Sequence, residues 1–177
     1  MNFKKLFMIC FLCLIIWRCS SVAVTPEPTI DQISIQSEPI CIVFSLNPFC
    51  YRGKSNSLYV TGIMENKSLK KFIYLEYFLD SYDVGLPVGV SLKLDNDYYK
   101  LKKVATDYTS TLKITSEMSQ QVVDKILSAN VIMVSYSNNS ETKNIELSSG
   151  ERKDLAKQIK EVQEKLNAQV KMRIIKP

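Results

Sequence analysis

The side chains that could do covalent chemistry in this chain are one serine-lysine pair and three scattered carboxylates. Ser68 and Lys71 match the Ser-x-x-Lys pattern, in which a lysine takes the proton of a nucleophilic serine. Glu65, Glu76 and Asp80 could act as general acid and base if the fold brought them together. The companion Lys-Thr-Gly and Ser-Asp-Asn motifs are missing, and the sequence has no histidine. Histidine is the usual general base and a common metal ligand. We therefore expect a protein that is not an enzyme and has no catalytic residue, metal or cofactor.

Tyrosines and lysines gather in the middle third of the chain. Tyrosine suits a binding surface, because one side chain offers a large contact area and a hydrogen bond. Tyrosine is also a good strand residue, with a half-buried ring and a solvated hydroxyl, so the cluster can equally be a feature of the sheet. The residues that we take as a candidate binding surface are Tyr74, Tyr77, Tyr98, Tyr99, Lys100 and Lys102.

The five cysteines fall into two groups. Cys10, Cys13 and Cys19 lie near the N-terminus, whereas Cys41 and Cys50 lie further along the chain. Two cysteines in an exported chain favour one disulfide, and we expect Cys41 and Cys50 to form it. The alternative is two separate buried thiols.

The elements that would position these residues are mostly strands. Residues 88–94 alternate apolar and polar side chains, which is typical of a half-buried strand. Residues 58–64 and 72–79 read as a hairpin, and residues 171–177 as a final short strand. Because strands come early and helices late, we predict an α+β fold. It has an antiparallel sheet or small β-sandwich of about eight strands, with two packed helices near 116–128 and 149–169.

The second predicted helix has the clearer signals. Ser148 and Glu151 form a capping box at its start. An apolar stripe follows along the helix, and it either packs on the sheet of its own domain or forms a short coiled-coil seam with a partner chain. The stripe spans barely two heptads, which favours the sheet. Its members are Leu155, Ile159, Val162, Leu166 and Val170.

The first residues have the order of a secretory signal. Lys4 and Lys5 precede an apolar run over residues 6–17, and small residues follow. The run is shorter than the roughly 20 residues that a membrane-spanning helix needs. Ordinary cleavage after Ala23 is one way in which this leader could be used.

A second way follows from Cys19, Ser20 and Ser21, which come after the apolar run and Arg18. This leader resembles that of a bacterial lipoprotein. The resemblance implies that Cys19 receives a lipid and becomes the new N-terminus. The position before the cysteine holds Arg18, where that family has a small residue. The resemblance covers the leader alone.

Domain organisation follows from this interpretation. We expect a signal peptide over 1–18, a tether or disordered arm over 19–36, and one globular domain over 37–177. The formal net charge is +5, of which the leader supplies three positive charges. The remaining charge of about +2 is too small and too dispersed for a nucleic-acid partner.

The expected function is that of a non-enzymatic lipoprotein of the bacterial cell envelope, at the periplasm or cell surface. The membrane is then one partner, through the N-terminal lipid, and a protein partner and the oligomeric state stay open. The alternatives are a secreted soluble binding protein cleaved after Ala23 and a hydrolase that uses carboxylates or Ser68 with Lys71.

Overall fold

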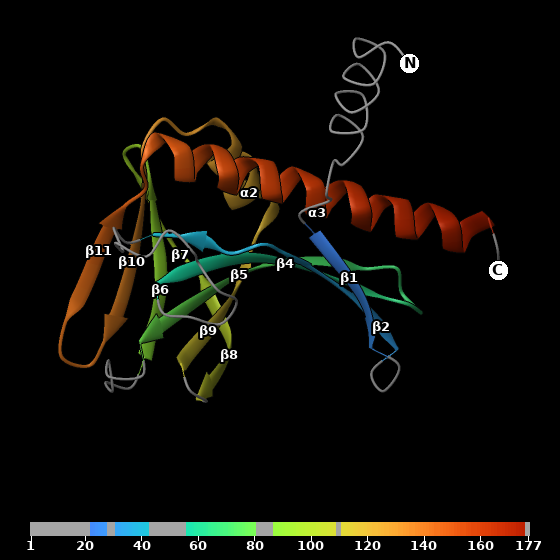
Figure 1. The fold of residues 1–177 in the computed structure, drawn as a ribbon, viewed down its shortest axis with the longest axis horizontal. Helices are drawn as coiled ribbons and strands as arrows, with labels where there is room; N and C mark the ends of the chain where they lie inside the picture. The colour runs from blue at the N-terminus through green and yellow to red at the C-terminus, as the bar shows by residue number, and fades with distance from the viewer. Residues whose placement is uncertain (1–21, 28–30, 43–55, 81–86, 109–110, 176–177) are drawn as a thin grey trace, which may run out of the picture.

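The computed structural model describes residues 22–27, 31–42, 56–80, 87–108 and 111–175 of the chain (Figure 1). One sheet has seven strands and the other has four. The seven strands are β1 (Val22–Glu27), β2 (Gln32–Ser37), β3 (Ile40–Cys41), β4 (Ser57–Glu65), β5 (Lys71–Asp80), β8 (Lys102–Tyr108) and β9 (Thr111–Met118). The four are β6 (Pro87–Leu94), β7 (Asp97–Lys100), β10 (Ile132–Asn138) and β11 (Thr142–Glu146). The described helices are α2 (Gln120–Ser128) and α3 (Ser149–Ile175).

Every strand pair is antiparallel. The seven-stranded sheet runs β1-β2-β4-β5-β9-β8, with β3 also paired to β4, and the four-stranded sheet runs β11-β10-β6-β7. The predicted α+β class with two packed helices is confirmed. Eleven strands are described where about eight were expected, and two of them, β1 and β2, come largely from the predicted arm.

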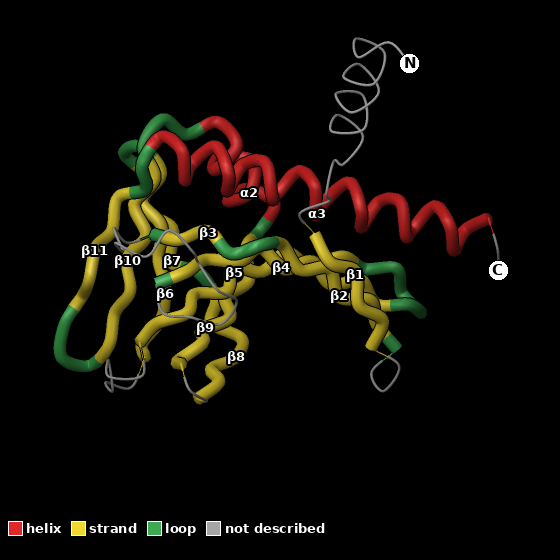
Figure 2. Tube along the Cα trace, viewed as in Figure 1, coloured by secondary structure: helices red, strands yellow, loops and turns green. Residues whose placement is uncertain are grey.

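The core lies on one face of the seven-stranded sheet. Alternation along β4 and β5 turns Val60 and Leu75 to this face, where both are buried. α3 covers the β1-β2-β4 part of the face, as Figure 2 shows. The four-stranded sheet covers the other part, where the rings of Tyr77 and Tyr136 meet edge to face at 6.2 Å. One continuous core therefore joins both sheets and the helices.

α3 packs closely on the sheet at Gly62 of β4. A Cβ atom at Gly62 would lie 2.5 Å from Val162 Cγ1 and 2.8 Å from Leu166 Cδ1. The helix can approach this strand only because glycine has no side chain. Leu155, Ile159, Val162 and Leu166 are buried, so the packing of the apolar stripe on its own sheet is confirmed.

The N-terminal cap of α3 is also confirmed. The Ser148 N–H donates to Glu151 Oε2 at 2.6 Å, and the Glu151 N–H donates to Ser148 Oγ at 3.3 Å. The other end differs from the prediction, since residues 171–175 continue α3 and do not form a strand. This stretch has helix-favouring Lys, Met and Arg residues and no glycine or proline to stop the helix.

The start of the first predicted helix is wrong by four residues. Ser116 is buried in β9, and α2 begins at Gln120 with Ser119 as its N-cap. The Ser119 hydroxyl accepts from the Val122 N–H at 3.4 Å. Period-two burial of Leu112, Ile114, Ser116 and Met118 against β5 keeps this segment in the sheet.

The predicted tether over 19–36 is wrong for its described residues. Val22–Glu27 pairs with Gln32–Ser37, and the latter strand also pairs with β4. Ile33 and Ile35 alternate inward and are buried under α3. The few apolar residues of this arm alternate with polar ones, which is the spacing of a strand that packs one face against the core.

Candidate functional site

The face of the seven-stranded sheet opposite α3 is the candidate site, and we call it the open face. Strand register places Thr61 of β4 beside Gln36 of β2 and Tyr74 of β5, and all three point away from Gly62 and its helix contact. Most of its aromatic and polar side chains are half-buried, but Tyr59, Thr61 and Glu76 are buried and Lys102 and Asp107 are exposed. Its members include Gln36, Tyr59, Thr61, Ile63, Phe72, Tyr74, Glu76, Phe78, Lys102, Asp107, Lys113 and Glu117.

Two aromatic pairs form the apolar part of the open face. The rings of Phe72 and Tyr74 stack with centroids 6.3 Å apart, and those of Tyr59 and Phe78 tilt together at 4.9 Å. Tyr59 is buried, whereas Phe72, Tyr74 and Phe78 keep part of their rings in solvent. Such half-exposed rings offer contact area at little conformational cost to a partner.

A line of polar side chains crosses the same face over four strands, and we call it the polar ribbon. Gln36 Nε2 donates to Glu76 Oε2 at 2.8 Å. Lys113 Nζ lies 3.9 Å from Glu76 Oε1 and 2.9 Å from Asp107 Oδ2. The ribbon therefore holds Glu76, only 6% exposed, in a paired state, as a buried carboxylate requires.

Burial and the neighbouring carboxylates act in opposite ways on the pKa of Lys113. Burial lowers the pKa of its ammonium group, but the hydrogen bond from Lys113 to Asp107 and the charges of Glu76 and Asp107 raise it by more. The net effect is a raised pKa. Lys113 is thus a fixed cation at neutral pH, with a carboxylate on either side.

Thr61 adds a group with unused hydrogen-bonding capacity. Its Oγ1 atom is buried and has no hydrogen-bond partner. A buried hydroxyl without a partner costs free energy, so Thr61 Oγ1 is a polar atom on the described part of this face that could gain a hydrogen bond without losing one.

Tyr74 lies beside an acidic residue at the margin of the face. Glu117 is its register partner on β9 and pairs with Lys102 at 3.0 Å. Burial raises the pKa of the Tyr74 phenol, and the charges of Glu117 and Glu65 raise it further. The phenol stays protonated and can donate a hydrogen bond.

The residues predicted as one binding surface separate in the structure. Tyr74 and Lys102 lie on the open face. Tyr77 is 1% exposed in the core, so its assignment to a surface is wrong. An odd spacing along β5 puts it on the face opposite Tyr74.

The other three predicted surface residues lie on the four-stranded sheet. Tyr98 and Lys100 are exposed on its outer face and border a shallow hollow of about 380 Å³. Tyr99 is half-buried and packs against the core. The tyrosines that cluster in the sequence therefore lie in three different places: the open face, the core, and the outer face of the four-stranded sheet.

The catalytic alternatives receive no support from side-chain placement. Ser68 donates to Glu65 Oε2, and Lys71 Nζ donates to Asn167 Oδ1 at 2.7 Å. Glu76 pairs with Tyr59 of β4, six residues from Glu65, which corresponds to about 20 Å along a strand. Glu65 and Glu76 do not converge. The Asp80 side chain lies outside the described part of the structure.

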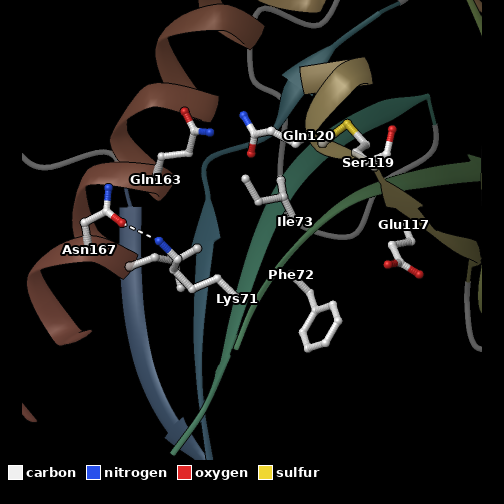
Figure 3. A pocket seen from close by; sticks show the side chains of 10 residues that line it. Lys71, Phe72, Ile73, Glu117, Ser119, Gln120, Gln163 and Asn167 are labelled. Atoms are coloured by element: carbon white, nitrogen blue, oxygen red, sulfur yellow. Dashed lines mark hydrogen bonds between the residues drawn. The ribbon is translucent and has the colours of Figure 1, made fainter. Parts of the chain in front are cut away.

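A pocket of about 470 Å³ lies where α3 passes the start of α2 (Figure 3). Ile73 and Leu166 give it apolar walls, while Gln120, Gln163 and Asn167 give it amides. Its charged neighbours already have partners, since Lys71 bonds Asn167 and Glu117 pairs with Lys102. The open face has the stronger claim, because its described residues combine the partnerless buried hydroxyl of Thr61 with the half-exposed rings of Phe72 and Tyr74.

The structure describes only one of the cysteines named above. Cys41 of β3 is disulfide-bonded. Cys19 and Cys50 lie outside the described residues, so the predicted lipid site and the predicted Cys41–Cys50 pairing stay predictions. Within the described ranges no three His, Cys, Asp or Glu side chains gather as a metal site. Neither described helix is both long and apolar enough to span a membrane.

Comparisons with protein-family models, curated proteins and solved structures give no match to this chain. The fold and the open face are accordingly the basis for any functional assignment.

The polar ribbon was missed by reasoning from the sequence. A weak signal existed, because Lys113 lies between the apolar residues Leu112 and Ile114 of a strand and so shares its outward face with other polar residues. Gln36 could not be found, because it joins Glu76 across 40 residues of sequence.

Proposed function

We propose that the protein is an exported, non-enzymatic lipoprotein of the bacterial cell envelope, anchored at Cys19, whose open face binds a partner. The observation that carries this proposal is the position of Val22. It is the first residue of β1, is 5% exposed, and pairs with Ser37. Its carbonyl accepts a hydrogen bond from Lys165 Nζ at 2.5 Å.

Cleavage after Ala23 would remove Val22 with all of these contacts. Burying a valine side chain contributes about 1.5 kcal/mol or more. Processing at Cys19 leaves β1 whole. The strand thus favours the lipoprotein interpretation over the soluble alternative.

The position of β1 also determines how a lipid at Cys19 would orient the domain relative to the membrane. Only Ser20 and Ser21 separate Cys19 from Val22, and three residues of extended chain reach about 10 Å. Val22 lies beside α3 (Figure 1). A lipid on Cys19 would hold the α3 side near the membrane and direct the open face towards a partner.

The partner that suits the open face combines apolar and polar groups. Phe72, Tyr74 and Phe78 offer rings to apolar side chains, and Thr61 and Lys113 offer polar groups between them. Aromatic residues around paired charges are typical of a protein-binding surface. We infer a protein partner.

Metabolic palmitate labelling with membrane fractionation tests the anchor. We expect label and membrane association for the wild type, and loss of both for Cys19→Ala. Cys13→Ala is the matched control, since it removes a leader cysteine and should keep the label. Unlabelled soluble protein starting at Val24 would contradict the proposal and support the secreted alternative.

Site-specific photo-crosslinking tests whether the open face binds the partner. A crosslinker at position 72 should capture a discrete protein in cells. The matched position 98, an exposed aromatic on the four-stranded sheet, should not. Equal capture at both positions would remove the open face as the binding surface.

A further inference from the structure

The last turns of α3 have no part in the folded core. Leu166 is the last buried residue of the helix, and residues 171–175 are all exposed. We call residues 171–175 the α3 tail. In Figure 1 the tail extends past β1 and β2, beyond the edge of the seven-stranded sheet.

Large apolar side chains are nevertheless concentrated in this tail. Met172, Ile174 and Ile175 are 52%, 65% and 77% exposed. Exposed apolar residues in such density mark an interaction surface. Folding alone does not explain them.

Charge indicates what the tail contacts. From Lys165 to Pro177 the sequence has four basic residues and no acidic one. Lys171 and Arg173 alternate with the apolar side chains of the tail. Basic and apolar residues interleaved on a helix are typical of segments that lie in the interface of an anionic bilayer.

The tail also lies close to the start of the domain. Lys165 binds the Val22 carbonyl, and ten residues of α-helix separate Lys165 from Ile175, a length of about 15 Å. An anchor at Cys19 and the α3 tail would therefore meet the same patch of membrane.

We propose that the α3 tail is a second membrane contact, which inserts Met172, Ile174 and Ile175 into an anionic lipid surface while Lys171 and Arg173 bind headgroups. The inference rests on the proposed anchoring at Cys19 for its geometry. Two attachments fix the domain in one orientation, where a single lipid at Cys19 would leave it free to rotate about that point.

Tryptophan quenching by lipid tests this proposal in the full chain. Trp17 is the one tryptophan, so Trp17→Phe/Ile174→Trp places a single reporter in the tail. The matched protein is Trp17→Phe/Tyr98→Trp, with its reporter exposed at the other end of the molecule. Both are reconstituted in vesicles of phosphatidylcholine and phosphatidylglycerol with brominated acyl chains. We expect severalfold stronger quenching at position 174 than at position 98.

Charge variants define the chemistry of the contact. Each cation near an anionic surface strengthens binding about fivefold, so Lys171→Glu/Arg173→Glu, which removes two cations and adds two anions, should weaken docking by at least about 25-fold and bring quenching at 174 down to the level at 98. Lys93→Glu/Lys100→Glu makes the same charge change on the four-stranded sheet and should leave quenching at 174 unchanged.

The outcomes separate this inference from the anchor. Palmitate on Cys19 with equal quenching at both positions overturns the tail contact and keeps the anchor. Absence of palmitate, with phosphatidylglycerol-dependent quenching at 174 when vesicles are added to the exported protein, overturns the anchor and keeps the tail contact. Self-association in vesicle-free solution that Ile174→Ser abolishes would identify a second copy as the occupant and refute the lipid contact.

Discussion

Thr61 and Lys113 show how single residues shape the open face. The Thr61 hydroxyl is buried without a hydrogen-bond partner, whereas Lys113 lies between the carboxylates of Glu76 and Asp107. Thr61 has unused hydrogen-bonding capacity, and Lys113 fixes a charge pattern across β5, β9 and β8. Both arrangements suit the binding role proposed for this face.

Replacing Thr61 with valine should separate binding from stability. Thr61→Val removes a hydroxyl that makes no hydrogen bond and keeps the side-chain shape, so we expect the free energy of unfolding in urea to stay equal or rise by up to about 1 kcal/mol. Crosslinking of the partner from position 72 should weaken. Thr61→Ser is the matched control, since it keeps the hydroxyl. A large loss of stability for the valine variant would show that the hydroxyl has a partner.

Lys113 should make stability depend on alkaline pH. Its folded pKa is raised above the ordinary lysine value of 10.5, so its stabilising effect is complete below pH 10.5 and is lost as pH rises through the folded pKa. We expect Lys113→Met to be less stable than the wild type at pH 8 by up to about 1 kcal/mol, and the difference to shrink at pH 11. Urea unfolding at both pH values measures it. A difference that stays constant would contradict the ion-pair explanation.

At the scale of elements, close helix–strand and loop contacts hold the sheets together. α3 reaches β4 over Gly62. The β6–β7 turn reaches the segment between α2 and β10, because Asp95 Oδ1 accepts from the N–H groups of Asn130 and Val131, each at 2.9 Å. Each contact joins segments far apart in sequence.

Gly62→Ala should destabilise the protein through this helix contact. Its Cβ would overlap Val162 and Leu166, and such overpacking costs about 1–3 kcal/mol. Urea unfolding measures the loss. In the double variant Gly62→Ala/Val162→Ala the overlap with Val162 disappears, so the second substitution should cost less there than in the wild type. Strictly additive effects would show that the close approach does not exist in solution.

Asp95→Ala should weaken the link between the turn and the α2–β10 segment. Two backbone N–H groups lose their acceptor, and Asp95 has a positive φ of 54°, which aspartate and asparagine tolerate better than alanine. We expect a loss of about 1–3 kcal/mol by thermal or urea unfolding. Asp95→Asn keeps an acceptor oxygen and should lose less than half as much. Equal losses would assign the effect to the missing charge.

At the scale of the whole molecule, β1, the first described strand, is part of the fold. It closes one edge of the seven-stranded sheet and lies beside α3. If the proposed lipid is attached at Cys19, this strand couples the attachment to the position of α3 and the direction of the open face.

The residue at which the processed chain begins should therefore affect the free energy of unfolding of the domain. A chain beginning at Val24 lacks the buried Val22 and its Lys165 contact, so we expect it to unfold at lower urea concentration than a chain beginning at Ser20, by about 1.5 kcal/mol or more. In the chain that begins at Ser20, Val22→Ala should reproduce about half of that loss. Equal stability of the two chains would remove the argument for processing at Cys19.

The sequence determined the local features of this protein. Period-two alternation predicted the strand over 88–94, and the Ser148–Glu151 spacing predicted the cap of α3, because both patterns depend on neighbours within a few residues. The same reasoning failed at 19–36 and 171–177. The strand with the buried Ile33 and Ile35 is stabilised by pairing with the distant β4, which the local sequence does not show. The end of α3 leaves the core, so its sequence has no apolar periodicity that predicts a helix.

Only the tertiary structure decided which polar residues act together. Gln36, Glu76, Lys113 and Asp107 come from four strands, and their contacts depend on a register that no single strand specifies. Tyr74 and Tyr77 are neighbours in sequence but lie on opposite faces, since side chains alternate along a strand. The open face and the α3 tail are thus products of sheet pairing and helix packing, which fix positions that composition and spacing leave undetermined.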